Sequence, residues 1–263
     1  MTRVIKIGGR AQGDPRLSDA LRLAACQRPG APPSAAATMC VVHGGGDEVS
    51  ALQRRLGLEP KFRGGRRVTS AEDLEVVRMV LSGTINKRLV SLLLSQGVPA
   101  VGISGEDGGL FAASATDSEA LGRVGGNLVV KADIVLHLLC GGFIPVISPV
   151  ARELGEPGTP AGGLNVNGDD AAAALAASLN ADELVLVADV PGVMQGGVVL
   201  PSLDVGHAGE LIASGVAVGG MAAKLEAAAH ALLRGVSCVR IAGLDGIHDE
   251  AAGTKIVLSH TSV

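Results

Sequence analysis

The chain has 263 residues, is 47% hydrophobic and carries a net charge of −4, which is enough apolar content for a sizeable buried core. The negative charge and the absence of Trp and Tyr argue against a nucleic-acid partner. No apolar run reaches the roughly 18 residues of a membrane span, and an immediate strand-like segment leaves no room for a signal peptide, so we expect a cytoplasmic protein without membrane contacts.

Short β-branched apolar runs alternate with helix-like stretches along the chain. The predicted strands cover residues 3–7, 39–43, 99–103, 144–148, 184–189 and 236–242. The predicted helices cover residues 17–26, 47–56, 70–96, 131–140, 169–179, 207–214 and 221–234. The third helix begins with the capping-box pattern Thr69-x-x-Glu72. This alternation predicts an α/β fold with helices layered on a mainly parallel sheet.

Two segments are rich in Pro and Gly and are too short to link separate domains. We expect residues 28–38 to connect a helix to a strand and residues 155–163 to form a turn. The four cysteines are scattered among apolar neighbours, which predicts buried free thiols and no zinc site. They are Cys26, Cys40, Cys140 and Cys238.

The first predicted strand carries Lys6 near its end and is followed by Gly8 and Gly9. A glycine turn lets backbone N–H groups approach a ligand closely, and a phosphate is the natural ligand beside a lysine. A tight turn with a solvated lysine is the alternative that these few residues leave open.

Three glycines, Gly44, Gly45 and Gly46, follow the second predicted strand and lead into a helix. Their amides could point from the positive end of that helix at a developing oxyanion. The chain has no G-x-x-x-x-G-K-[ST] loop, and Val49 occupies the third glycine position of the dinucleotide pattern. A dehydrogenase is therefore disfavoured.

Residues 64–69 (GGRRVT) place two arginines in a glycine-rich turn before the long predicted helix. A guanidinium there could bind a carboxylate through two hydrogen bonds, and Arg67 is the better candidate, although a solvated hairpin tip is the alternative. Residues 165–170 (NVNGDD) could orient a substrate and a lysine or simply cap a helix. The segments 189–192 (DVPG) and 219–224 (GGMAAK) add a strand-end loop and a second lysine.

The order and approximate spacing of these motifs resemble those of the amino-acid kinase family, most closely its acetylglutamate kinases, from Lys6 to about Thr254. Ten motifs carry the resemblance: KIGG, HGGG, GRRVT, GTINK, SGEDGG, LGRVGG, PVISP, NVNGDDAA, ADVPGV and GGMAAK. The resemblance implies one domain, a three-layer αβα sandwich around a mainly parallel open sheet. An N-terminal lobe, about 1–180, would bind the acylated amino acid, and a C-terminal lobe, about 181–263, would bind ATP.

Acetylglutamate kinases transfer the γ-phosphoryl group of MgATP to the γ-carboxylate of N-acetyl-L-glutamate, the second step of arginine synthesis through acetylated intermediates. The resemblance implies that Lys6 binds the transferring phosphoryl group, that Lys224 stabilises the leaving side and that Asp169 holds both lysines. A carboxylate nucleophile is already ionised at neutral pH, so no general base is required.

The resemblance also implies ligand contacts. The amides of Gly44 and Gly45 would meet the phosphoryl oxygens and the γ-carboxylate. Arg67 would clamp the substrate's α-carboxylate, and Asn165 would contact its amide side. The implied nucleotide-binding residues are Gly8, Gly9, Asp189, Val190 and Gly192. No protein metal ligand is implied, because the nucleotide phosphates would hold the Mg²⁺.

Some details depart from the family. Glu106 stands where the loop Ser-Gly-Lys-Asp-Gly has lysine, which we expect to reverse a charge near the phosphates, and Ala222 and Ala223 replace a more polar or proline-containing spacer. Arginine-regulated members carry an extra N-terminal helix that joins dimers into a hexamer, whereas this chain begins at its first strand. We therefore expect a homodimer that is insensitive to arginine.

Three alternatives stay open on the sequence. A related kinase of lysine synthesis phosphorylates aminoadipate carried on a small acidic protein, although GRRVT resembles the acetylglutamate version of the substrate hairpin. The acyl group could be succinyl instead of acetyl. A non-catalytic sensor of the same fold is disfavoured, because it would not need Lys6, Asp169 and Lys224 together.

Overall fold

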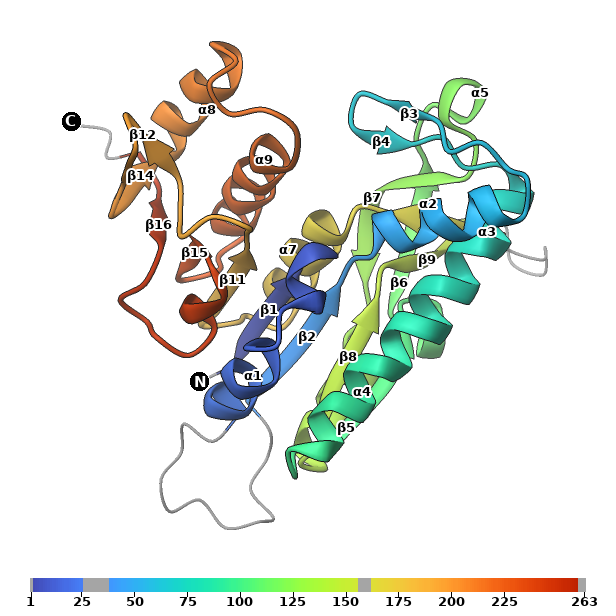
Figure 1. The fold of residues 1–263 in the computed structure, drawn as a ribbon, viewed down its shortest axis with the longest axis horizontal. Coiled ribbons are helices and arrows are strands. Elements are labelled where there is room, and N and C mark those ends of the chain that lie inside the picture. Colours follow the sequence, from blue (N-terminus) through green and yellow to red (C-terminus); the bar gives the residue numbers. More distant parts are fainter. Residues whose placement is uncertain (1, 26–37, 156–161, 260–263) are drawn as a thin grey trace.

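The computed structural model describes residues 2–25, 38–155 and 162–259, and its centre is an eight-stranded sheet (Figure 1). The strand order is β14 (Ser202–Asp204), β16 (Thr254–Val257), β15 (Val239–Ala242), β11 (Glu183–Val187), β1 (Arg3–Ile7), β2 (Met39–His43), β8 (Ile144–Ser148) and β5 (Ala100–Ser104). All neighbours are parallel except β15 and β16. The predicted mainly parallel sheet is confirmed.

Helices cover both faces of this sheet and complete three layers. Successive strand residues point to opposite faces, so that Val4 packs in a core with α7 and α9, whereas Ile5 packs in a core with α1 and α4. The longer helices are α1 (Leu17–Ala25), α2 (Gly46–Arg55), α3 (Ala71–Arg78), α4 (Asn86–Ser95), α6 (Asp133–Cys140), α7 (Gly168–Ser178), α8 (Val205–Ala213) and α9 (Gly219–Leu233). The predicted αβα sandwich is therefore confirmed.

Several small elements lie outside the predicted strands, although the sequence analysis did place a hairpin around residues 64–69. Four strands, β6 (Phe111–Ala115), β7 (Val124–Val130), β9 (Val150–Glu153) and β10 (Gly163–Val166), close into a small barrel. Two short hairpins pair β3 (Phe62–Arg63) with β4 (Arg66–Arg67) and β12 (Met194–Gln195) with β13 (Val198–Val199). Gly64 and Gly65 form the turn of the first hairpin with φ angles of 55° and 74°, which glycine adopts most readily.

The remaining helical elements are short. They are η1 (Arg10–Gly13), η3 (Asp107–Gly109), α5 (Ser118–Leu121) and η4 (Leu244–Ile247). The long predicted helix at 70–96 is interrupted by a π-helical segment, η2 (Met79–Ile85), between α3 and α4.

The capping box of that helix uses a different pair from the predicted one. Ser70 and Asp73 exchange side-chain and backbone hydrogen bonds, so the prediction of Thr69 and Glu72 is wrong by one residue. The reason is that Thr69 is fully buried, where its hydroxyl donates to the Arg67 carbonyl and accepts from Asn165. Thr69 therefore joins the hairpin to the barrel.

The cysteine prediction is only partly correct. Cys40 is buried and free, and burial raises the pKa of its thiol to about 12. Cys140 is exposed at the end of α6 and Cys238 is half-buried, so the expectation of burial is wrong for Cys140. Cys26, most of the 28–38 connection and most of the 155–163 turn lie outside the described residues.

In the part of the chain that the structure describes, no helix has the length and apolar character needed to cross a bilayer.

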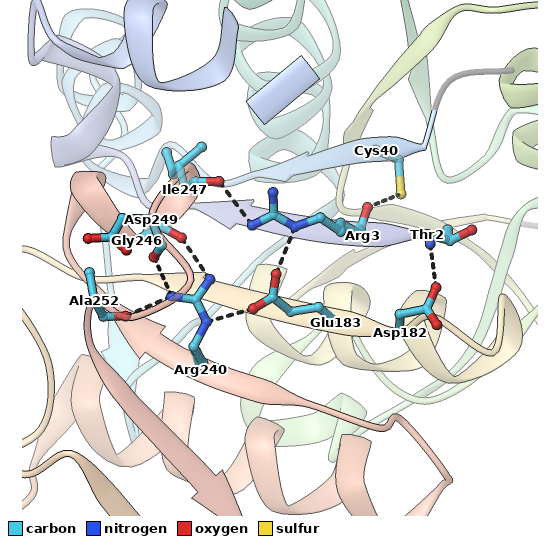
Figure 2. Close-up of polar contacts among 10 residues, drawn as sticks. All are labelled: Thr2, Arg3, Cys40, Asp182, Glu183, Arg240, Gly246, Ile247, Asp249 and Ala252. Atoms are coloured by element: carbon cyan, nitrogen blue, oxygen red, sulfur yellow. Dashed lines mark hydrogen bonds and ion pairs between the residues drawn. The ribbon is translucent and has the colours of Figure 1, made fainter. Parts of the chain in front are cut away.

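A buried cluster of charges lies at the amino ends of three central strands (Figure 2). Glu183 accepts hydrogen bonds from Arg3 Nε at 2.7 Å and from Arg240 Nε at 2.6 Å, and we call these three residues the arginine triad. Further guanidinium nitrogens donate to the backbone carbonyls of Gly246, Ile247, Asp249 and Ala252. The triad therefore fixes the segment around η4 to the sheet.

Candidate active site

Three buried charged side chains from β1, α7 and α9 meet near the carboxyl end of β1. Lys6 Nζ lies 3.0 Å from Asp169 Oδ1, and Lys224 Nζ lies 3.2 Å and 3.3 Å from the two oxygens of the same carboxylate. We call these residues the lysine triad. The structure thus brings together the three residues that the sequence analysis grouped, although the chain separates them widely.

The charges of the lysine triad depend on one another. Burial alone would raise the pKa of Asp169, but the ammonium groups of Lys6 and Lys224 outweigh it, and the pKa is lowered. Burial and the charge of Lys6 lower the pKa of Lys224 against the opposing effect of Asp169. The cluster carries one more positive than negative charge when fully ionised, which suits an anionic ligand.

A cavity of about 400 Å³ opens beside the lysine triad, and all three triad residues line it. The other predicted site residues along its wall are Gly9, Gly44, Gly45, Arg67 and Asn165. Gly8 and Asp189 do not line it. A Cβ atom at Gly8 would lie 4.0 Å from the carbonyl oxygen of Val187. Asp189 accepts a hydrogen bond from the exposed side chain of Arg10 at 3.2 Å.

The glycine loop after β2 offers fewer free amides than predicted. The Gly44 N–H donates to the Ile7 carbonyl at 2.9 Å, so the expectation that this amide meets the ligand is wrong. The Gly44 carbonyl is also engaged, because it accepts from Gln12 Nε2 at 2.8 Å. Helix α2 begins at Gly46 without a side-chain cap at Gly45, which leaves the amides of Gly45 and Gly46 at the positive helix end.

Close packing favours glycine at position 45. A Cβ atom there would lie 2.1 Å from Ile85 Cδ1 and 2.9 Å from Leu81 Cδ2, so these two side chains would have to shift. Behind the loop, buried His43 has its Nδ1 3.1 Å from the Gly44 carbonyl and its Nε2 3.2 Å from Asn86 Nδ2. Because a carbonyl oxygen only accepts and an amide nitrogen only donates, the His43 ring carries its proton on Nδ1. Burial lowers the pKa of His43 to about 4, so the ring is neutral at pH 7.

Arg67 is a buried guanidinium, 8% exposed, on the wall of the same cavity. Its Nη2 donates to the Gly46 carbonyl and to Ser50 Oγ, both at 2.7 Å, and the group lies 4.7 Å from the centroid of the Phe62 ring. Burial lowers its pKa. Among the described residues no carboxylate lies within 4 Å of Arg67, which leaves its charge available to a ligand.

A second, mostly apolar cavity of about 210 Å³ lies in the C-terminal part of the chain. Its lining includes the predicted residues Val190 and Gly192, together with Met194, Leu211, Val216 and Met221. Helix α9 joins the two cavities, because Met221 faces this one and Gly220 and Lys224 face the other. No side chain caps the start of α9, so its first amides are also left at a positive helix end.

Glu106 lies in an ion pair outside these two cavities. Its carboxylate pairs with Arg78 at 2.6 Å and lines neither cavity. The expected reversal of charge near the phosphates stays a prediction, and the guanidinium of Arg78 offsets the charge of Glu106. Across the described ranges, no group of three or more His, Cys, Asp or Glu side chains could hold a metal ion.

The sequence analysis missed Ser50 and Gln53, which both bond to Arg67. They stand four and seven residues after Gly46, so they share one face of α2 with the glycine loop. Polar residues at helical spacing on a buried face were the signal that could have revealed them.

Known proteins resemble this chain over nearly its whole length. The family model described as the amino acid kinase family matches residues 1–243. The acetylglutamate kinase of Chloroflexus aurantiacus is 44% identical over 256 residues, covering 96% of this chain and 95% of that protein. That of Roseiflexus castenholzii is 42% identical over 259 residues, covering 97% and 94%. Giardia carbamate kinase, at 16% identity, covers 98% of this chain and 99% of its own with a TM-score of 0.69, which shows a likeness of fold alone.

Proposed function

The chain belongs to the amino acid kinase family, and we propose that it transfers the γ-phosphoryl group of ATP to the γ-carboxylate of N-acetyl-L-glutamate. This reaction is the second step of arginine biosynthesis through acetylated intermediates. The observation that carries the proposal is the lysine triad on the wall of a cavity that also holds the buried cation Arg67. The site thus offers positive charge both where a phosphoryl group would transfer and where a second carboxylate would bind.

The reaction needs charge neutralisation more than proton transfer. An oxygen of the γ-carboxylate attacks the γ-phosphorus, and the bond from that phosphorus to the oxygen bridging to the β-phosphate breaks, giving an acyl phosphate and ADP. Lys6 binds the transferring group, and Lys224 stabilises charge on the leaving side. Asp169 orients both ammonium groups, and its two oxygens are already engaged by lysines, so it is not free to bind metal.

The substrate lies between the glycine loop and the hairpin. The amides of Gly45 and Gly46 stabilise the phosphoryl oxygens at the start of α2. Arg67 binds the α-carboxylate, to which a guanidinium can donate two parallel hydrogen bonds. The Nδ2 of Asn165 is engaged with Thr69 at 3.1 Å, so its carbonyl oxygen accepts from the substrate's amide.

The nucleotide binds in the C-terminal lobe, about 181–263, and the acylated amino acid in the N-terminal lobe, about 1–180. The base occupies the apolar cavity with Val190 and Gly192, and the phosphates extend past the start of α9 toward Lys224. Gly9 approaches the phosphates from the loop after β1. Mg²⁺ held by the phosphates supplies further neutralisation of charge.

A homodimer is the assembly that we propose. Strand β5 is an open edge of the central sheet, and exposed apolar side chains lie on the elements beside it, namely Leu94, Leu136 and Phe143. Light scattering that gives the mass of one chain at micromolar concentration would contradict this assignment.

A coupled assay for ADP tests the activity. We expect ADP release that depends on N-acetyl-L-glutamate and on MgATP, and trapping of the acyl phosphate by hydroxylamine. A panel with N-succinyl-L-glutamate and carrier-linked aminoadipate measures acyl specificity. Release of ADP with carrier-linked aminoadipate but not with N-acetyl-L-glutamate would overturn the proposed substrate, and no release with any of them would favour a sensor.

A further inference from the structure

Gln53 stands between Arg67 and the carboxylate of Asp73. Arg67 Nη1 donates to Gln53 Oε1, and Gln53 Nε2 donates to Asp73 Oδ1 at 2.5 Å. Gln53 is 1% exposed, so both ends of its amide must be satisfied inside the protein. The three residues come from β4, α2 and the first turn of α3, and they join the substrate hairpin to both helices.

The orientation of the Gln53 amide follows from its partners. An ionised carboxylate only accepts hydrogen bonds, so Asp73 must face the amide nitrogen, and the amide oxygen must face Arg67. Asp73 is held in turn, because its other oxygen accepts from the Ser70 N–H at 2.9 Å in the capping box. The helix cap thus fixes the carboxylate, the carboxylate fixes the amide, and the amide fixes the guanidinium.

The Arg67 guanidinium is surrounded by neutral hydrogen-bond acceptors. Every acceptor in hydrogen-bond contact with Arg67 is neutral, namely the Gln53 amide, the Gly46 carbonyl and the Ser50 hydroxyl. A glutamate at position 53 would have nearly the same size and would still accept from Arg67, but it would pair with the guanidinium permanently. A buried guanidinium that lacks a carboxylate is stabilised when a ligand supplies one.

We propose that Gln53 is a positioning residue that orients Arg67 for the substrate's α-carboxylate and keeps the negative charge of Asp73 from pairing with it. This inference rests on the proposed function, because it takes N-acetyl-L-glutamate as the ligand of Arg67. Gln53 thereby determines selectivity for substrates that have an α-carboxylate, although it contacts Arg67 and not the substrate.

Two substrates test the inference. N-Acetyl-L-glutamate is compared with 4-acetamidobutanoate, which has the same chain and reacting carboxylate but lacks the α-carboxylate. The ratio of kcat/KM for the two compounds measures what Arg67 contributes. In the unchanged enzyme we expect a ratio of about 10 to 100 or more, since a hydrogen-bonded charge contributes about 1.5–3 kcal/mol.

The variants Gln53→Glu and Gln53→Met are then compared. We expect Gln53→Glu to reduce the ratio about tenfold or more, through a higher KM for N-acetyl-L-glutamate with the KM for ATP unchanged. Gln53→Met removes the acceptor without adding charge, so it should reduce the ratio less.

Gln53→Glu also removes the donor to Asp73 and sets two carboxylates side by side, so we add a double variant that combines Gln53→Glu with Asp73→Asn, which returns an amide donor to that contact. A merely structural role predicts that the double variant recovers the full ratio, whereas the proposed role predicts that the ratio stays low because a carboxylate still pairs with Arg67.

The outcomes separate the two proposals. If the unchanged enzyme releases no ADP with N-acetyl-L-glutamate, the proposed function fails. If it discriminates between the substrates and Gln53→Glu keeps the full ratio, the role of Gln53 is wrong and the proposed function stands. If Gln53→Glu does not fold, the ratio measured with Gln53→Met decides, and an unchanged ratio there also overturns the inference. Ser50→Ala is the matched control, because it removes another neutral partner of Arg67 and should change the ratio by only a few fold.

Discussion

The arginine triad and the lysine triad are alike in composition and opposite in position. Each consists of two cations and one carboxylate, each is buried, and each takes one cation from β1, where Arg3 stands near the start and Lys6 near the end. The two side chains point to opposite faces of the sheet, because they are three residues apart on a strand. One strand thus carries both clusters.

The triads differ in what the cations do with their remaining hydrogens. The guanidinium groups of the arginine triad donate to backbone carbonyls around η4, as Figure 2 shows. In the described chain, the ammonium groups of the lysine triad meet no acceptor other than Asp169, and both line a cavity. Burial and charge are therefore common to both triads, and the lysine triad differs in having unused ammonium hydrogens beside a cavity.

The largest expected effect comes from removing one lysine. We expect Lys6→Met and Lys224→Met each to lower kcat by about 10⁴-fold, as for other cations that stabilise phosphoryl transfer. The free energy of unfolding should change little, because Asp169 keeps one ammonium partner. Steady-state kinetics and urea unfolding measure the two quantities. A kcat within tenfold of the unchanged enzyme would remove the lysine triad from the mechanism.

The corresponding change in the arginine triad should affect stability instead. Glu183→Gln leaves two buried guanidinium groups without their carboxylate, and we expect the free energy of unfolding to fall by about 3–5 kcal/mol. The KM values of the folded fraction should stay the same.

Asp169→Asn is the matched variant in the lysine triad. It should abolish activity with a smaller loss of stability, because a lysine beside a cavity can release its proton. Equal losses of stability would contradict the comparison.

His43 makes the end of the sheet with the lysine triad sensitive to pH. Its folded-state pKa of about 4 lies below the ordinary value of 6.5, so between these values the unfolded chain takes up a proton that the native protein does not. Stability must therefore fall as the pH falls from about 6.5 to about 4. We expect His43 to contribute a loss of about 2 kcal/mol between pH 7 and pH 5. Urea unfolding of His43→Asn at both pH values should show a smaller difference than the unchanged protein does.

The smallest effect is expected outside both triads. The Arg78–Glu106 pair is partly exposed, with side-chain exposures of 33% and 28%, so Glu106→Gln should cost less than about 1 kcal/mol of stability. Because Glu106 lines neither ligand cavity, the KM for ATP should not change. A KM for ATP that shifts severalfold would place Glu106 closer to the phosphates than its pairing with Arg78 indicates.

The sequence predicted six of the eight strands of the central sheet, missing β14 and β16, and predicted the site only in part. Buried parallel strands are continuous apolar runs, so β1, β2 and β8 were located to the residue, whereas the barrel strands, which contain Gly, Ala and Ser, gave no such signal. Residues such as Lys6 were recognisable because glycines flank them. The use of the Gly44 amide by Ile7 and the pairing of Glu106 with Arg78 depend on tertiary contacts that local pattern does not encode.

Helix α9 carries Met221 and Lys224 one turn apart, and each side chain faces a different cavity. A shift of the helix backbone at one of these residues therefore also shifts the other. With the base against Met221 as proposed, a purine or pyrimidine that fits poorly there would move the start of α9 and, with it, Lys224. We expect discrimination among nucleoside triphosphates to appear as slower turnover at saturation, and not only as weaker binding.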